Sequence, residues 1–228
     1  MHHATRHSRV AHGGQVNSVR SCDKLPAVAY LLQLDSSANL TSSTSRRLTA
    51  EFAQRWVAMG PEREIRRRDL HTSPLPHLPT NTLHFTPPRR PDDGVDPTVE
   101  ATRLQDELIS ELSGAEHVVI GAPMYNFSMP STLKAWLDYV HVIGATSPAD
   151  EGVAPLLSKP VTVVSARATP TGSDQRADFV LGPLFTILGG FMGMDVQAFV
   201  VHTEAPTAAG DFHRPYEHVL GQLLDGIE

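Results

Sequence analysis

Short apolar runs alternate with stretches of helical periodicity along most of this chain, and that alternation restricts the fold more than any other feature. Residues 27–34 read AVAYLLQL and give way to polar residues at Asp35, as a buried parallel strand does. Comparable apolar runs occupy residues 117–122, 160–165 and 196–202. Strands that alternate with helices predict a parallel sheet with right-handed crossovers and helices on both faces.

The segments between these runs are predicted as helices by their 3.6-residue periodicity. They comprise residues 46–59, 98–113, 130–143, 179–192 and about 211–224. In the clearest of them, Pro130 suits the first turn and one apolar stripe follows, made of Leu133, Trp136, Leu137, Val140 and Ile143. Residues 64–70 form a weaker strand candidate, because three consecutive arginines suit a core poorly. The proline-rich residues 72–97 predict a long surface loop.

Five strands in this rhythm predict an α/β fold, a flavodoxin-like three-layer sandwich with strand order 2-1-3-4-5. That order places a ligand crevice at the carboxyl ends of strands 1, 3 and 4. The length of 228 residues favours one domain, which we assign to residues 27–228. Residues 1–26 are rich in His, Arg, Gly and Ser and contain one acidic residue, so we expect an extension outside the fold.

The overall charge and the cysteine content exclude several classes of function. A formal charge of −6 and a pI near 6.0 argue against a nucleic-acid or anionic-membrane partner. No run approaches the ~20 apolar residues that a membrane-spanning helix needs. Cys22 is the single cysteine, which excludes an internal disulfide and a multi-cysteine metal site and suits a cytoplasmic location. His2, His3 and His7 are assigned to the extension, so no metal site is expected.

The loop after the first predicted strand is rich in hydroxyls and contains no glycine. It reads DSSANLTSSTS at residues 35–45 and leads into the first helix. Serine and threonine hydroxyls beside the unpaired amides of a helix N-terminus suit a terminal phosphate monoester. The same residues are also ordinary helix caps, so this loop alone leaves a cap and a phosphate site as alternatives. The glycine motifs of dinucleotide and P-loop sites are absent.

A second loop, between the strand at 117–122 and the helix at 130–143, carries the most specific motif in the chain. Residues 123–138 read PMYNFSMPSTLKAWLD. This segment resembles the signature P-M-Y-N-F-x-x-P-S-x-L-K-x-W-x-D of the FMN-dependent NADH:quinone oxidoreductases and azoreductases. The resemblance extends over roughly residues 27–203, including a later helix and turn at residues 185–195.

The resemblance implies FMN as the bound cofactor, NADH or NADPH as hydride donor, and a quinone or azo compound as the second substrate in a ping-pong cycle. It also implies a homodimer. The phosphate-binding residues that it suggests are Ser37, Ser43, Thr44 and Ser45. Those around the flavin ring are Pro123, Met124, Tyr125, Asn126, Phe127, Ser165, Ala166, Arg167 and Ala168. The flavin carries the redox chemistry, so no side chain is assigned as catalytic acid or base.

Two departures from the family pattern affect these expectations. Residues 166–168 read ARA and lack the family's two glycines, so either Arg167 takes over part of the flavin contact or the loop follows another path. Residues 146–150 carry no aromatic side chain, so substrate preference does not transfer. His141 is assigned to a surface or interface position. An electron carrier, a flavin-binding redox sensor and a phosphodiester hydrolase stay open as alternatives.

Overall fold

The computed structural model describes residues 29–92, 94–150, 152–168, 178–203 and 221–222. The predicted extension at 1–26 and nearly all of the predicted last helix lie outside these residues. The strands are β1 (Ala29–Asp35), β2 (Arg63–Asp69), β3 (His117–Gly121), β4 (Pro160–Arg167) and β5 (Asp195–His202). The helical elements are α1 (Thr44–Ala58), η1 (Asn81–His84), η2 (Pro87–Arg89), α2 (Val99–Gly114), α3 (Ser131–Val140), α4 (Leu181–Leu184) and η3 (Phe185–Phe191).

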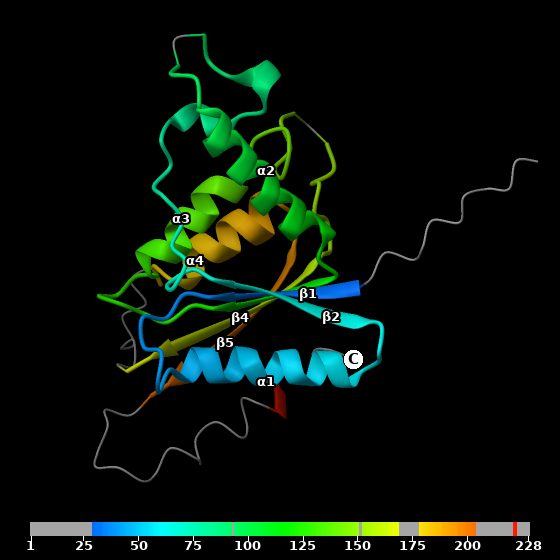
Figure 1. Cartoon of the computed structure of the whole chain (residues 1–228), viewed down its shortest axis with the longest axis vertical. Helices are drawn as coiled ribbons and strands as arrows, with labels where there is room; N and C mark the ends of the chain where they lie inside the picture. Colours follow the sequence, from blue (N-terminus) through cyan, green and yellow to red (C-terminus); the bar gives the residue numbers. More distant parts are fainter. Residues whose placement is uncertain (1–28, 93, 151, 169–177, 204–220, 223–228) are drawn as a thin grey trace, which may run out of the picture.

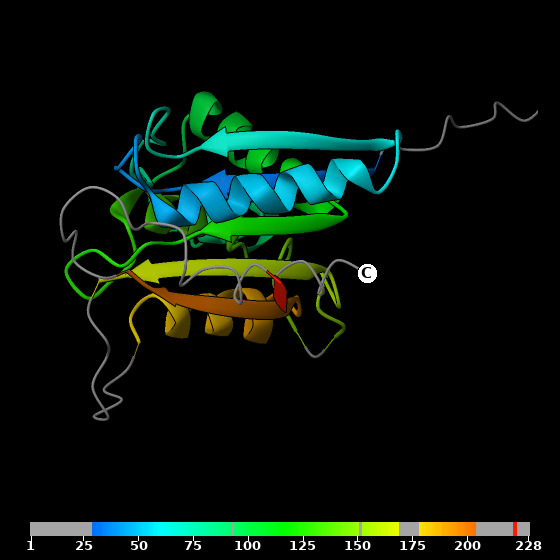
Figure 2. The same cartoon turned by 90° about the horizontal axis from the view of Figure 1, so that it is seen from below.

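The five strands form one parallel sheet in the order β2-β1-β3-β4-β5, which confirms the predicted topology. Helix α1 covers one face of the sheet, while α2, α3 and α4 lie on the other (Figure 1). In Figure 2 the arrowheads of all five strands point to the same edge. The loops that follow the strands therefore gather at one end of the molecule.

Alternate residues along each strand enter different halves of the core, because side chains on a strand point to opposite faces. Leu32 and Val118 pack with Trp136 on the side of α2 and α3. Leu31 and Val119 pack with α1 on the other side. All of β3 and the five central residues of β1 are buried on both faces, which explains why these strands read as nearly continuous apolar runs.

Strand β2 contains the arginines that made it the weakest strand prediction, and its place at the sheet edge accounts for them. Arg68 forms ion pairs with Glu107 and Glu111 of α2 at 2.7 and 2.6 Å. The Arg66 guanidinium lies 3.8 Å from the centre of the Tyr30 ring. An edge strand can direct long charged side chains to neighbouring helices and solvent. The arginines of β2 therefore do not have to enter the core.

The helix predicted over residues 179–192 differs in detail from the structure. Only Leu181–Leu184 is α-helical, and η3 continues it as a π-helix in which the Met192 amide donates to the Ile187 carbonyl, five residues back. Gly189 and Gly190 have a low propensity for the α-helix, which is consistent with the wider π-helical turn at this position. Within the described residues, no helix is both long and apolar enough to cross a membrane.

Candidate functional site

The first loop, residues 36–43, leaves β1 at the edge where the strands end. The Ser36 hydroxyl donates to the carbonyl of Gly121 at 2.6 Å, which joins this loop to the end of β3. Ser43 is the N-cap of α1, and its hydroxyl accepts the Arg46 amide at 3.3 Å and lies 3.1 Å from the Ser45 hydroxyl. The cap interpretation of this loop is thus correct for Ser43, and it brings two hydroxyls to the helix N-terminus.

Asn39 shapes the outer part of the same loop. Its side-chain oxygen accepts the amides of Thr41 and Ser42 at 3.1 and 2.9 Å. Residues 36–45 include no acidic side chain, and the first turn of α1 has none either. Amides and hydroxyls at a helix N-terminus without nearby carboxylates on the loop suit an anion such as a phosphate monoester.

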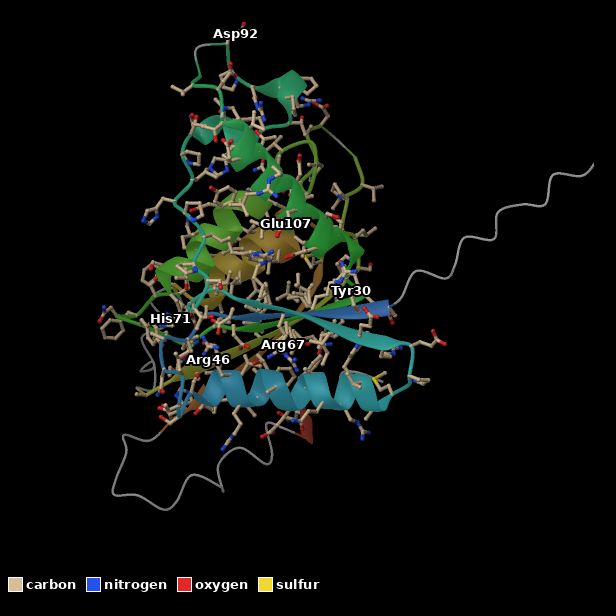
Figure 3. All side chains as sticks on the ribbon, viewed as in Figure 1. Tyr30, Arg46, Arg67, His71, Asp92 and Glu107 are labelled. Carbon is tan, nitrogen blue, oxygen red and sulfur yellow. The ribbon has the colours of Figure 1, made fainter. Side chains whose placement is uncertain are left out.

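Arg46 fixes this loop from the first turn of α1, a role that the sequence did not reveal. Its guanidinium forms a bidentate pair with Asp69 at the end of β2, both contacts being 2.8 Å. It also donates twice to the Ser37 carbonyl, at 3.0 and 2.7 Å. The Arg46 partner holds the pKa of Asp69 far below its usual range, and the amides of His71 and Thr72 add to that effect. In Figure 3, Arg46 and His71 lie at the carboxyl ends of the strands, away from Tyr30.

Asp35 ends β1 beneath the first loop and is largely enclosed by protein. Its carboxylate accepts the Thr49 hydroxyl at 2.7 Å and the Gln33 amide at 2.9 Å. Burial raises the pKa of Asp35, although both hydrogen bonds oppose the shift. A Cβ atom at Gly121 would stand 3.0 Å from one Asp35 oxygen, so this close approach of β1, β3 and α1 favours glycine there.

The second loop forms a tight turn at Tyr125–Ser128. Tyr125 and Ser128 exchange backbone hydrogen bonds of 2.8 and 3.0 Å. Between them Asn126 and Phe127 adopt positive φ angles of 49° and 66°. Left-handed backbone is costly for a residue such as phenylalanine, and such strain concentrates at binding sites. The turn leaves the Phe127 side chain 70% exposed at the end of the sheet where the loops gather.

The end of β4 touches the second loop. The Met124 amide donates to the Ala166 carbonyl at 2.9 Å. Ser128 forms an isolated parallel bridge with Phe179, which precedes α4. Ser165 and Ala166 are buried, whereas Ala168 is exposed. The first and second loops also meet, because the Tyr125 hydroxyl lies within hydrogen-bond distance of the first loop at Ser37 and Ala38.

Arg167 is directed inward rather than toward solvent. Its side chain is 2% exposed and donates to the Asp178 carboxylate and the Ser165 hydroxyl, both at 2.8 Å. Asp178 in turn accepts the amides of Val180 and Leu181 at the start of α4. The Arg167 Nε is buried and is left without a hydrogen-bond partner among the described residues. Two of the three guanidinium nitrogens are thus engaged within the protein.

Pro123 and Thr44 complete the predicted set, whereas His141 belongs elsewhere. Pro123 is buried between β3 and the turn, and Thr44 begins α1. His141 follows α3, and its ring lies 5.3 Å from that of Phe191 on η3. Burial lowers the pKa of His141. Among the described residues, no group of three or more His, Cys, Asp and Glu side chains is arranged to hold a metal ion.

Comparisons with known proteins agree with this geometry. The family model described as flavodoxin-like fold matches residues 30–220. An FMN-dependent NADH:quinone oxidoreductase of Kineococcus radiotolerans is 43% identical over 183 residues, which cover 78% of this chain and 84% of the relative. A protein of the same description from Azotobacter vinelandii is 40% identical over 193 residues, covering 82% of this chain and 93% of the relative.

Solved structures show the same fold. An FMN-dependent NADH-azoreductase from Bacillus anthracis, solved in complex with FMN, has a TM-score of 0.69 and 20% sequence identity. The similarity covers 86% of this chain and 97% of the azoreductase chain.

Proposed function

The chain belongs to the family of FMN-dependent NADH:quinone oxidoreductases, and from that premise we propose that it binds FMN and transfers electrons from NADH to a quinone. The observation that carries the proposal is the meeting of two loops, which follow β1 and β3, with the carboxyl end of β4. The loop after β1 offers hydroxyls and amides at the N-terminus of α1. The loop after β3 presents the exposed ring of Phe127 on a turn with positive φ angles. This is the position at which a doubly wound sheet binds its ligand.

The residues of the first loop fit the phosphate of FMN. We propose that Ser37, Ser43, Thr44 and Ser45 bind it, together with the amides at the start of α1. Because the Arg46 charge is already paired with Asp69, the phosphate would be held mainly by neutral donors and the helix dipole. This arrangement predicts a preference for FMN over riboflavin, which lacks the phosphate.

The second loop and the end of β4 lie where the flavin ring of FMN would bind. We propose that Pro123, Met124, Tyr125, Asn126 and Phe127 frame one side of it and that Ser165, Ala166, Arg167 and Ala168 face its polar edge. The inward course of Arg167 favours the alternative in which this segment follows its own path, because the guanidinium is buried and paired with Asp178. FMN would supply the two-electron chemistry when bound, and the protein would orient it and its substrates.

The net reaction consumes NADH, one proton and a quinone and yields NAD⁺ and the hydroquinone. We propose that azo compounds are also reduced and that both substrates use one pocket in turn. NADPH stays an alternative donor. The exposed ring of Phe127 offers an apolar surface against which flat, aromatic acceptors could stack.

A homodimer is also proposed. Phe185 and Phe191 on η3 are 43% and 50% exposed, and Phe179 before α4 is 56% exposed, so this side of the molecule carries large apolar side chains in solvent. Such surfaces commonly mark protein contacts. Sedimentation of the purified protein should give twice the chain mass, and Phe191→Glu should shift it toward the monomer.

We further propose that residues 27–228 form one domain, outside which residues 1–26 lie; the family match from residue 30 to residue 220 supports this. A chain that begins at Leu25 should keep the melting temperature and the flavin content. The cytoplasmic location expected from the single cysteine stays a prediction.

Absorbance spectra of the purified protein, with and without added FMN, test the cofactor, and NADH oxidation with and without a quinone tests the reaction. We expect bound flavin and quinone-dependent oxidation of NADH. Flavin binding without NADH turnover would favour the electron carrier or the redox sensor. Protein that stays colourless with added FMN would contradict the proposal.

A further inference from the structure

Tyr125 connects two loops that are far apart in the sequence. Its backbone belongs to the tight turn after β3, but its hydroxyl reaches the first loop. The hydroxyl oxygen accepts the Ala38 amide at 2.8 Å and lies 3.1 Å from the Ser37 hydroxyl oxygen. The Ser37 oxygen also accepts the Asn39 amide at 3.2 Å, so one tyrosine hydroxyl contacts the centre of the turn at residues 37–39.

The same turn is held from its other side by Arg46. The guanidinium binds the Ser37 carbonyl while Tyr125 contacts the Ser37 hydroxyl and the next amide. Ser37 itself is 2% exposed. Tyr125 and Arg46 therefore fix Ser37 from two sides. Because the Tyr125 oxygen accepts the Ala38 amide, the Tyr125 hydroxyl can donate its own hydrogen to the Ser37 oxygen, which leaves the Ser37 hydrogen as a donor that a phosphate could use.

We infer that the Tyr125 hydroxyl is a positioning group for the phosphate loop, in addition to any contact that the turn makes with the ring. This inference rests on the proposed FMN site. A donor that is already oriented loses less conformational freedom when a ligand binds, so the Tyr125 hydroxyl contributes to phosphate affinity through Ser37. The aromatic ring of Tyr125, by contrast, can be kept while the hydroxyl is removed.

Tyr125→Phe tests the role, with Tyr30→Phe as the matched control. The Tyr30 hydroxyl also makes one hydrogen bond to the backbone, at 2.8 Å to the Glu111 carbonyl, but it lies toward the opposite end of the strands (Figure 3). FMN and riboflavin are titrated into each flavin-depleted full-length protein, and binding is followed by flavin fluorescence. Melting temperatures of the unliganded proteins check folding.

In Tyr125→Phe we expect FMN affinity to fall by about two- to tenfold, the range of one net hydrogen bond. Riboflavin affinity should change by less than about twofold, so the preference for FMN shrinks. Tyr30→Phe should retain the preference of the wild type. A merely structural role, or a role confined to the ring, would lower both affinities by the same factor and would overturn the inference.

A double-mutant cycle with Ser37→Ala provides a second criterion. If Tyr125 acts through Ser37, Ser37→Ala should cost less FMN affinity in the Tyr125→Phe protein than in the wild type. Strictly additive losses would contradict the coupling. Should Tyr125→Phe not fold, Tyr125→Trp keeps an aromatic ring without the hydroxyl and serves in the same measurements.

The proposed function and this inference fail in different ways. Wild-type protein that binds neither flavin would contradict the proposed function. Wild-type protein that prefers FMN, with the same preference in Tyr125→Phe, would contradict only the role of Tyr125.

Discussion

Replacing Arg46 with methionine removes the side chain that fixes the first loop to the end of β2. Four hydrogen bonds are lost: two to the Asp69 carboxylate at 2.8 Å each, and two to the Ser37 carbonyl at 3.0 and 2.7 Å. A hydrogen bond to a charged group contributes about 1.5–3 kcal/mol. The two side chains are 17% and 31% exposed, so solvent screens part of the interaction. We therefore expect Arg46→Met to lower the free energy of unfolding by about 2 kcal/mol near neutral pH.

The dependence of this loss on pH follows from Asp69. Its pKa is lowered in the folded protein, so its contribution to stability is complete above the unfolded pKa of ~4 and is lost as the pH falls through the folded pKa. Without Arg46 the folded pKa of Asp69 should return toward its ordinary value. The difference in stability between wild type and Arg46→Met should therefore be constant near neutral pH and shrink below about pH 4.

Urea unfolding at several pH values measures the effect, and Arg89→Met is the control. Arg89 also pairs with an aspartate, Asp150, at 2.5 Å, but these side chains are 45% and 75% exposed. An exposed pair of this kind contributes less than about 1 kcal/mol. If Arg46→Met is no more destabilising than Arg89→Met, or if its cost is the same at pH 3 as at pH 7, the reasoning is wrong.

Three further predictions concern the site. Ser43→Ala combined with Ser45→Ala should weaken FMN binding by about 1–3 kcal/mol while leaving riboflavin binding nearly unchanged; equal affinity of the wild type for both flavins would contradict the phosphate assignment. Phe127→Gly should raise the free energy of unfolding by up to about 1 kcal/mol, because glycine tolerates positive φ, and should impair flavin retention or turnover. A variant in which stability and turnover both rise, or both fall, would refute this. Steady-state rates should give parallel double-reciprocal lines, and His141→Ala should change kcat by less than about tenfold; a loss of several orders of magnitude would indicate a missed proton relay.

The fold could be predicted from the sequence because its main signals are local. Apolar runs such as residues 117–122 and the periodic stripe from Leu133 to Val140 indicate burial directly, and alternating strands and helices permit few topologies. The helix predicted to reach residue 143 ends at Val140, and Ile143 is only partly buried. Strand order also predicts the end of the sheet at which a ligand binds, and the motif at residues 123–138 indicates the family. Even the weak strand at residues 64–70 was found, although its arginines are explained only by its position at the sheet edge.

Several features of the site depend on the tertiary structure alone. Arg46 and Asp69 are 23 positions apart, and Tyr125 and Ser37 are 88 apart. No periodicity links such residues, because their contact depends on the register of β1 between β2 and β3 and on the course of each loop. The orientation of the Arg167 side chain is a further example. The sequence alone does not determine it, and the ion pair with Asp178 before α4 directs the guanidinium inward.

The sequence by itself therefore determined the sheet, the end at which a ligand binds and the residue types available there, since burial and helix capping are read over a few neighbouring positions. The tertiary structure decided which of those residues form hydrogen bonds and ion pairs with one another. Hydrogen bonds and ion pairs need their atoms within about 3–4 Å, and only the packed sheet brings loops from β1, β2, β3 and β4 that close.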